Sequence, residues 1–523
     1  MDLQHISEIE RAAHSGRGEL LRFGVALLFI VGVMFYAAMR GSGDGGLILV
    51  MAAMVGGYMA MNIGANDVAN NVGPAVGSRA LSLAGALVIA AVFEAAGAMI
   101  AGGEVVGTIR SGIINPDLIA DSDTFVWIML AALLAGALWL NIATAVGAPV
   151  STTHSIVGAV IGAGMAAAGP SIVDWGTMGG IAASWIVSPL LGGVFAAAFL
   201  YLIKRSITYQ SDMAAAARKM VPLLVGLMAW TFGTYLILKG LNKVLTVGFG
   251  AATLYGFLIA IPAFLIARRA ASGLIANTKQ SVNRLFTVPL IFAAALLSFA
   301  HGSNDVANAV GPLAAIVDVV SHGGVLNKSA PLPSWVMMVG AIGIAIGLAL
   351  FGPKVIRTVG SEITELDQMR AYCIAMAATF TVIVASQLGL PVSSTHIAVG
   401  GVFGVGFLRE YLKSNYDRMV AEIKEHHPEG DMAEIETFIA RFEKASIDQK
   451  GEMLRDLKER SKKAEDPAHF SKLDRKGLRK VYRRELVKRS QLMRIAAAWV
   501  ITVPASALMA AMLFFTIRGM MVP

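Results

Sequence analysis

Long apolar stretches constrain this chain more than any other feature. An α-helix needs about 20 mainly apolar residues to cross the hydrocarbon core of a bilayer. The clear candidates are 23–39, 81–101, 125–148, 179–203, 221–238, 245–267, 335–352, 372–388 and 495–516. Four more apolar stretches are short or interrupted: 47–78, 155–169, 287–320 and 396–411. The pattern predicts an all-α polytopic membrane protein, some of whose transmembrane helices are broken or re-entrant.

Composition agrees with this class of fold. Only 15% of the residues are charged and 56% are hydrophobic, whereas a soluble domain carries about 25% charged residues. The net charge of +8 does not predict nucleic-acid binding, because the Lys and Arg residues lie in the loops that flank the spans. The single cysteine, Cys373, excludes an internal disulfide and a cysteine-based metal site. Residues 1–22 lack the apolar core of a cleavable signal.

Positive charge is concentrated in three polar segments, 204–219, 268–286 and 409–494. Counting spans places all three on one side, which the positive-inside rule makes the cytoplasm. We therefore expect a multi-pass protein of the bacterial inner membrane. Residues 412–494 alternate in charge and carry apolar residues at helical spacing, so we expect a cytoplasmic helical insert. A regulatory docking role for this insert stays open.

These boundaries divide the chain into seven parts. They are a cytoplasmic N-terminal segment (1–22), a first span with an outer loop (23–46), transport repeat 1 (47–203), linking spans with basic cytoplasmic loops (204–286), transport repeat 2 (287–411), the cytoplasmic helical insert (412–494), and a last span with the C-terminus (495–523).

Two unusual motifs each occur twice, in the same order. Residues 64–74 read GANDVANNVGP and 302–312 read GSNDVANAVGP; residues 149–158 read PVSTTHSIVG and 391–400 read PVSSTHIAVG. The aspartate of the first motif and the first serine of the second are 84 residues apart in one half and 88 in the other. The span count gives the halves opposite orientations. Inverted repeats are typical of secondary transporters, which bind substrate where the repeats meet near the membrane midplane.

Asp67 and Asp305 stand inside apolar stretches. An aspartate at the bilayer centre costs about 2.5–3.5 kcal/mol, so it normally faces a partner or a wet cavity. Nearby amides could act with these carboxylates in coupling a cation: Asn66, Asn70 and Asn71 in the first half, and Asn304 and Asn308 in the second. Asn, Gly and a following proline predict that each stretch is a broken helix. The oxygen ligands suit Na⁺ or the handling of a proton; the alternative is an Asn–Asp network that only locks two helices together.

The second motif predicts helix N-termini in both halves. Ser and Thr are favoured N-cap residues, and a helix N-terminus offers free N–H groups and a positive dipole end. Two such ends from inverted halves could hold a tetrahedral oxyanion. The hydroxyls that would contribute are those of Ser151, Thr152, Thr153, Ser393, Ser394 and Thr395.

Three further polar residues lie in or beside the apolar stretches. His154 and His396 lack the surrounding ligands of a zinc site, so we expect no bound metal. We expect each to hydrogen-bond the broken helices or to lie near the pathway; a role in proton coupling stays open. Glu94 has no acidic counterpart in the second half. It could complete a cation site or pair locally.

These motifs resemble the inorganic phosphate transporter (PiT) family, whose signature is a duplicated GANDVANA-type motif. The resemblance covers 47–203 and 287–411 and implies a phosphate symporter of about twelve spans, coupled to Na⁺ or H⁺. Asn71, Ser303 and the insert depart from the family pattern. The family positions tied to phosphate and cation handling correspond here to Asp67, Asn70, Asp305 and Asn308, with the hydroxyl positions at Ser151, Thr152, Ser393 and Ser394.

Charge makes cation coupling necessary for phosphate import. A doubly charged phosphate entering a negative cell works against about 4.6 kcal/mol per 100 mV, so a uniporter would expel it. The expected partners are phosphate, a co-transported cation (Na⁺ or H⁺, the latter with a neutral metal–phosphate complex as one variant), the lipid bilayer, and in some cases a second copy of the chain. A resident cofactor and an enzymatic activity are not expected. The alternatives are a sulfate permease of the same family and an anion channel.

Overall fold

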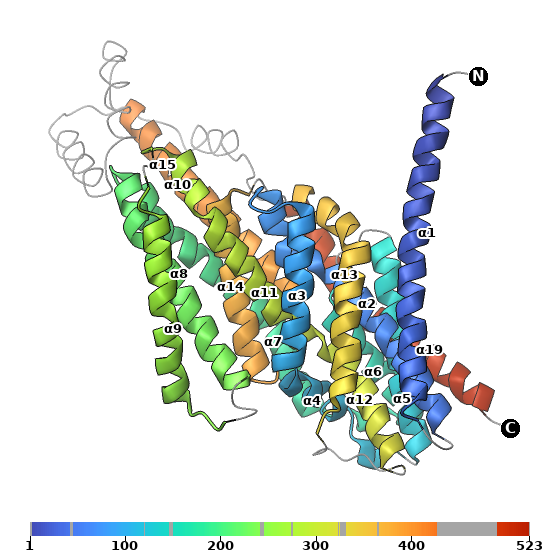
Figure 1. Ribbon diagram of the computed structural model, residues 1–523. Helices are drawn as coiled ribbons and strands as arrows, with labels where there is room; N and C mark the ends of the chain where they lie inside the picture. Colours follow the sequence, from blue (N-terminus) through green and yellow to red (C-terminus); the bar gives the residue numbers. More distant parts are fainter. Residues whose placement is uncertain are drawn as a thin grey trace.

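The computed structural model describes residues 3–41, 45–119, 121–145, 150–240, 245–273, 276–322, 324, 331–362, 366–425 and 489–521. Within these ranges all regular secondary structure beyond an isolated β-bridge is helical (Figure 1). Eleven of the described helices are long and apolar enough to cross a membrane. The expected all-helical polytopic fold is confirmed.

The first half of the chain forms one group of helices. They are α1 (Leu3–Ala38), α2 (Gly46–Gly77), α3 (Leu83–Ala101), α4 (Gly103–Ser111), α5 (Ser122–Ala145), α6 (Thr152–Ala168) and α7 (Trp175–Ile203). Three linking helices follow: α8 (Met213–Lys239), α9 (Phe249–Ala270) and α10 (Lys279–Leu285). The second half contains α11 (Thr287–Asp305), α12 (Ala307–Ser321), α13 (Ser334–Glu362), α14 (Gln368–Gln387), α15 (Ser394–Glu425) and α19 (Arg489–Met521).

The helices that carry the first motif run in opposite directions. In Figure 1, α2 rises from the lower end of the molecule, whereas α11 and α12 descend from the upper end, beside α10. Each lies against the third helix of a half: α2 packs on α13, and α11 packs on α3. The arrangement is that of two inverted halves around a common centre.

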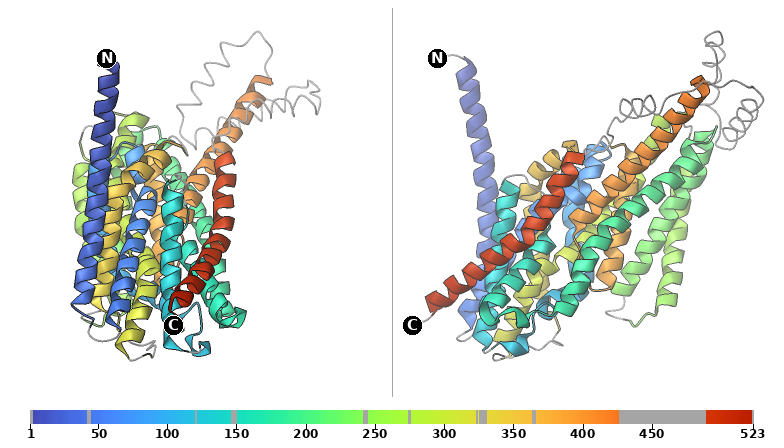
Figure 2. Two further views of the ribbon diagram at one scale, coloured as in Figure 1. Left: turned by 90° about the vertical axis from the view of Figure 1, so that its right-hand side faces the viewer. Right: turned by 180° about the vertical axis from the view of Figure 1, so that it is seen from behind.

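The two halves also exchange their last helices. The short helix α6 of the first half packs along α19 of the second, and α15 of the second half packs along α7 of the first (Figure 2). Glycines allow both crossings to be close. A Cβ at Gly158 would lie 2.7 Å from the carbonyl oxygen of Val503, and one at Gly193 would lie 3.0 Å from that of Gly400. α6 and α15 are therefore each supported by a helix of the opposite half.

The first glycine of each signature motif marks another backbone crossing. A Cβ at Gly64 in α2 would lie 2.8 Å from the carbonyl carbon of Ile344 in α13. A Cβ at Gly302 in α11 would lie 2.7 Å from the carbonyl carbon of Glu94 in α3. No side chain fits at either point, so the motif glycine sets how closely the aspartate-bearing helix approaches its neighbour.

The expectation of two broken helices is wrong for the first half. α2 is continuous through the whole motif, with Pro74 inside it, whereas α11 ends at Asp305 and α12 begins at Ala307. Weak helix formers do not interrupt α2 because its buried amide side chains find partners on other helices.

The end of the second half extends beyond its expected boundary. α15 continues to Glu425, and α19 begins at Arg489. Residues 426–488, most of the expected insert, lie outside the described residues.

Candidate functional site

Two buried aspartates form the centre of the molecule. Asp67 lies in α2 and Asp305 at the end of α11, and their side chains are almost completely inaccessible to solvent. Thr152, the first residue of α6, joins them: its Oγ1 lies 2.9 Å from Oδ2 of Asp67 and 3.1 Å from Oδ2 of Asp305. The structure thus brings both predicted carboxylates to one hydroxyl at a helix N-terminus.

The matching helix end of the second half reaches the same carboxylates. The hydroxyl of Thr395 donates to Oδ1 of Asp67 at 3.2 Å, and that of Ser394 lies 3.5 Å from Oδ2 of Asp305. Asn70 donates to Thr395 at 2.8 Å. The contacts of Thr395 cross between the halves, whereas Ser394 and Asp305 belong to the same half.

Asn308 completes the corresponding contact on the other side. Its Nδ2 lies 3.2 Å from Oγ1 of Thr152 and 3.2 Å from Oγ1 of Thr153. Thr153 in turn donates to the carbonyl of Val392 at 2.9 Å, which links the two helix entrances. Asn70 and Asn308 therefore occupy equivalent places, each against the helix end of the opposite half.

The two N-cap serines, Ser151 and Ser393, cap their helices and form no hydrogen bond with the aspartates within the described part of the chain. Oγ of Ser151 accepts from the N–H of His154 at 3.1 Å, and Oγ of Ser393 accepts from the N–H of His396 at 3.3 Å. Each is a normal N-cap contact. These serines begin the helices, while Thr152, Ser394 and Thr395 contact the carboxylates.

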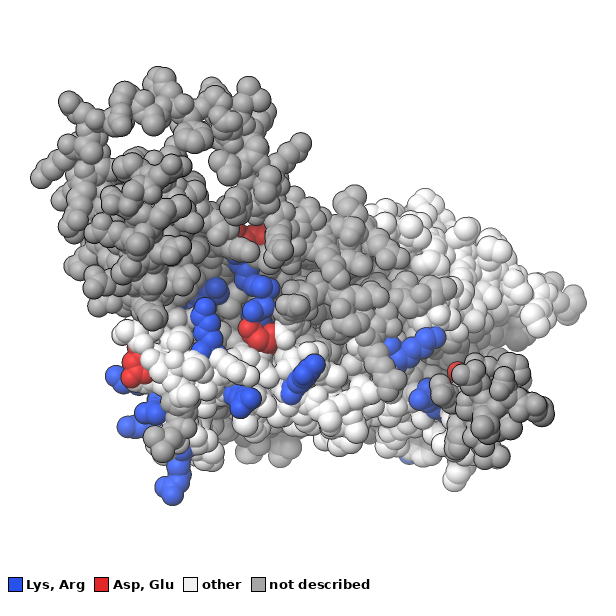
Figure 3. Space-filling view, turned by 90° about the horizontal axis from the view of Figure 1, so that it is seen from above, with Lys and Arg blue, Asp and Glu red and all other residues white. Residues whose placement is uncertain are grey.

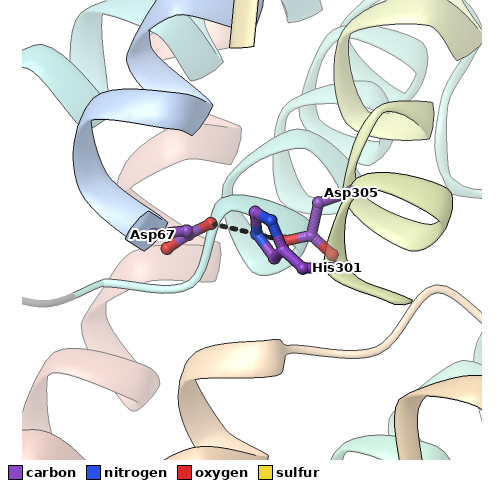
Figure 4. A group of neighbouring side chains, drawn as sticks. All are labelled: Asp67, His301 and Asp305. Carbon is purple, nitrogen blue, oxygen red and sulfur yellow. Dashed lines mark ion pairs between the residues drawn. The ribbon is translucent and has the colours of Figure 1, made fainter. Parts of the chain in front are cut away.

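His301 is a site residue that the sequence analysis missed. Its Nε2 lies 3.1 Å from Oδ2 of Asp305 and 3.6 Å from Oδ2 of Asp67, so the ring stands between the two aspartates (Figure 4). It precedes Asp305 by one helical turn. In the first half the corresponding position is Ile63, and this lack of a counterpart concealed the histidine from a search for repeated residues.

Glu94 lies on the other side of the His301 ring. Its Oε2 is 3.2 Å from Nδ1 of His301, and its Oε1 accepts from the amide of Asn71 at 2.7 Å. Of the two possibilities left open for Glu94, local pairing is observed, and through His301 it extends to the aspartates. Asn71, which departs from the family motif, has a partner for its amide in this glutamate.

Asn66 and Asn304 hold the chain where it enters the second motif. Asn304 donates to the carbonyl of Leu390 at 3.1 Å and accepts from the N–H of Val392 at 3.2 Å. In the orientation of the Asn66 amide that gives both its oxygen and its nitrogen a partner, the nitrogen donates to the carbonyl of Val150 at 3.2 Å and to Oδ1 of Asp67 at 3.3 Å. Both amides therefore position a helix entrance, and only Asn66 also contacts an aspartate.

His154 and His396 lie against each other where α6 and α15 begin. Their ring centroids are 4.5 Å apart, and the Trp185 ring of α7 lies 3.8 Å from that of His154. Their expected hydrogen bonds to the motif helices and a role in proton coupling stay predictions.

The cluster combines features that suit both a cation and an anion. One ligand atom each from Asp67, His301 and Asp305 lie within 4.8 Å of one another. With Glu94, three buried carboxylates face a single imidazole, and buried charge requires a compensating ion or proton. The α6 and α15 N-termini add hydroxyls and positive dipole ends that favour an oxyanion.

Fold and site together define a class: a multi-pass membrane transporter whose inverted halves enclose a buried polar site. A family comparison gives the particular assignment. The model of the phosphate transporter family matches residues 63–510, and the chain belongs to this family. The resemblance inferred from the motifs is confirmed.

Individual relatives match this chain over most of their own length. A Helicobacter pylori (strain J99) protein named "Putative phosphate permease" is 52% identical over 527 residues, which cover 98% of each chain. A Thermococcus kodakarensis protein of the same description is 40% identical over 71% of this chain and 91% of its own. A solved structure titled "The sodium-dependent phosphate transporter" matches with a TM-score of 0.73 and 30% identity, covering 91% of this chain and all of that one.

Proposed function

We propose that this protein imports inorganic phosphate across the bacterial cytoplasmic membrane by symport with cations. The observation that carries the proposal is the crosswise cluster, in which Asp67 and Asp305 meet the helix ends of both halves. A substrate bound there contacts both halves at once. Its binding can therefore favour one relative arrangement of the halves over another, as coupled transport requires.

The chemistry of the cluster favours phosphate over sulfate. Near neutral pH, phosphate keeps a proton on at least one oxygen, whereas sulfate has none. The P–OH group can donate to the carboxylate of Asp67 or Asp305, while the remaining oxygens accept from Thr152, Ser394 and Thr395. Sulfate would set a bare oxygen against a carboxylate, and buried polar groups left unmatched reject an analogue strongly.

Cations balance the charges that meet in this site. The three carboxylates of Asp67, Asp305 and Glu94 already outnumber the single imidazole of His301, and a phosphate dianion adds two negative charges. Two cations would neutralise the dianion, and a third would let the membrane potential assist import. The likeness to a sodium-dependent phosphate transporter supports Na⁺, while the imidazole and the carboxylates offer places for a proton.

Uptake by the purified protein in liposomes tests the proposal. Labelled phosphate should accumulate when an inward gradient of Na⁺ or H⁺ is imposed and should stop when that gradient is removed. Arsenate should compete, whereas sulfate in large excess should not. Equal inhibition by sulfate and arsenate would favour the sulfate permease. Phosphate flux that does not depend on the cation gradient would favour a channel.

A further inference from the structure

A buried ion pair joins the two halves at the end of the molecule opposite the N-terminus. Arg110 of α4 and Asp318 of α12 are 2.8 Å apart, and each side chain is 4% exposed. Both helices lie at the lower end of the molecule in Figure 1. Figure 3 looks onto the upper end, where Lys and Arg side chains gather. By the positive-inside rule that face is cytoplasmic, so the ion pair belongs to the outer end.

One face of α12 runs from the buried site to this ion pair. Residues three or four apart share a helix face, and this spacing joins Asn308, Gly311, Ala315 and Asp318. Asn308 belongs to the site, and a Cβ at Gly311 would lie 2.8 Å from that of Ile109 in α4. Ten residues separate Asn308 from Asp318, about 15 Å along a helix. α4 therefore covers the α12 face between the site and the outer end.

The end of α4 is fixed to its own half. The N–H of Asp174 donates to the carbonyl of Ile113 at 3.0 Å, and the N–H of Asn115 donates to the carbonyl of Ile172 at 2.7 Å. These bonds join the segment after α4 to the connection between α6 and α7. α4 packs on α12 of the other half, so separating these two helices means parting the halves at the outer end.

Asp318 stands at the border between this covered face and the outside water. Its other carboxylate oxygen lies 2.9 Å from Nδ1 of His322, whose side chain is 46% exposed. While α4 covers α12, the opposite charges of Arg110 and Asp318 compensate each other, because a buried charge without compensation is costly. If α4 left α12, water would reach both groups. The ion pair can therefore be paired and dry, or separated and hydrated.

We propose that α4 and α12 form the outer gate of the transporter, and that the ion pair of Arg110 with Asp318 is the latch that keeps this gate closed. The inference rests on the proposed function, since a gate requires a transported substrate. Alternating access parts the halves around a fixed site. Parting them here would uncover the α12 face from Asp318 inward to Asn308, which gives phosphate from outside a route to the aspartates.

Labelling of a cysteine behind the latch tests the gate. Ala315→Cys places a thiol on the covered α12 face, in a chain whose own cysteine is removed by Cys373→Ala. A membrane-impermeant methanethiosulfonate reagent is added to intact cells, and the rate of labelling is measured. Ala315 is buried, so its thiol reacts only when the gate opens. It should react from outside at least tenfold more slowly than Asp117→Cys in the exposed outer loop.

A double-mutant cycle separates the latch from general packing. Asp318→Asn takes the carboxylate away from the buried Arg110 guanidinium, which favours the open arrangement where water reaches that charge. Labelling of Ala315→Cys should become about tenfold faster, and Arg110→Gln should act in the same direction. The double variant leaves neither charge of the pair, so its rate should return toward that of the intact pair. The control, Glu104→Gln, makes the same carboxylate-to-amide change in α4 at the exposed ion pair with Lys239 and should leave the rate unchanged.

Four results would overturn the proposal. Two need no change to the ion pair: no reaction of Ala315→Cys from outside would place the entrance elsewhere, and a rate equal to that of Asp117→Cys would show that the outer end is not closed. Wild-type rates in both single variants would show that the ion pair does not hold the gate. Equal acceleration in the single and double variants would assign the effect to loosened packing. Thiol labelling does not depend on which anion is carried, so failure of phosphate uptake in liposomes is a separate outcome.

Discussion

Replacing Gly64 with alanine tests whether the signature glycine sets the position of the aspartate helix. The added Cβ would lie 2.8 Å from the carbonyl carbon of Ile344 and 2.9 Å from the backbone nitrogen of Leu348. Both atoms are backbone, so a rotamer change cannot relieve the clash and α2 must move away from α13. Overpacking of this kind costs about 1–3 kcal/mol.

The displacement should also reach the site, because Asp67 lies one helical turn after Gly64. Loss of one hydrogen bond to a charged group is worth about 1.5–3 kcal/mol, and 1.4 kcal/mol is a factor of ten in affinity. We therefore expect the phosphate concentration for half-maximal uptake to rise about tenfold or more, together with a lower Tm. Thermal unfolding in detergent and uptake in liposomes measure the two effects.

Gly73→Ala is the matched control, in the same motif and the same helix. A Cβ at Gly73 has no atom within 4 Å among the described residues, and alanine is the better helix former by about 1 kcal/mol. Its Tm should equal or exceed that of the wild type. If Gly64→Ala unfolds at the same temperature as Gly73→Ala and transports like the wild type, close packing does not explain the signature glycine.

Further predictions concern the carboxylates, the bridging hydroxyl and the orientation. Asp67→Asn and Asp305→Asn should each abolish coupled uptake in liposomes while elution in size-exclusion chromatography stays normal; wild-type rates in both would contradict a role in coupling. Thr152→Ala should weaken apparent phosphate affinity about tenfold or more, since a hydrogen bond to a charged group is lost, whereas Thr152→Ser should retain most of it; equal uptake by both would exclude the bridge. A cysteine at Asp117 should react with an impermeant reagent added to intact cells and one at Gly273 should not, and the reverse pattern would invert the assigned topology.

Much of the fold followed from the sequence because hydrophobic length and motif duplication are local signals. The expected spans match observed helices, and the two aspartates and the second-motif hydroxyls meet as the duplication predicted. The different roles of these hydroxyl groups could not be predicted from the sequence. Ser151 and Thr152 are adjacent and chemically alike, yet one caps a helix and the other bridges the carboxylates, which depends on the direction each side chain takes in space.

Unduplicated residues were the hardest to interpret. His301 and Glu94 each occur in one half alone, and their relation depends on the crossing of α11 and α3 at Gly302. A useful signal was present: a histidine one turn before an aspartate inside an apolar stretch is itself expensive to bury and points to a partner. The continuity of α2 was missed for a related reason: helix propensity is a property of the single residue, whereas the amides of α2 are stabilised by partners on other helices.

The exchange of final helices has a consequence for biogenesis. α6 has 17 residues, fewer than the roughly 20 needed to span a bilayer. The helix along which it packs, α19, follows all the other described helices in the chain. During synthesis the polar start of α6 must wait within the membrane while the whole second half and the insert are translated. We expect a nascent chain that stops before Arg489 to be recognised by membrane quality-control proteases even though its first half is complete.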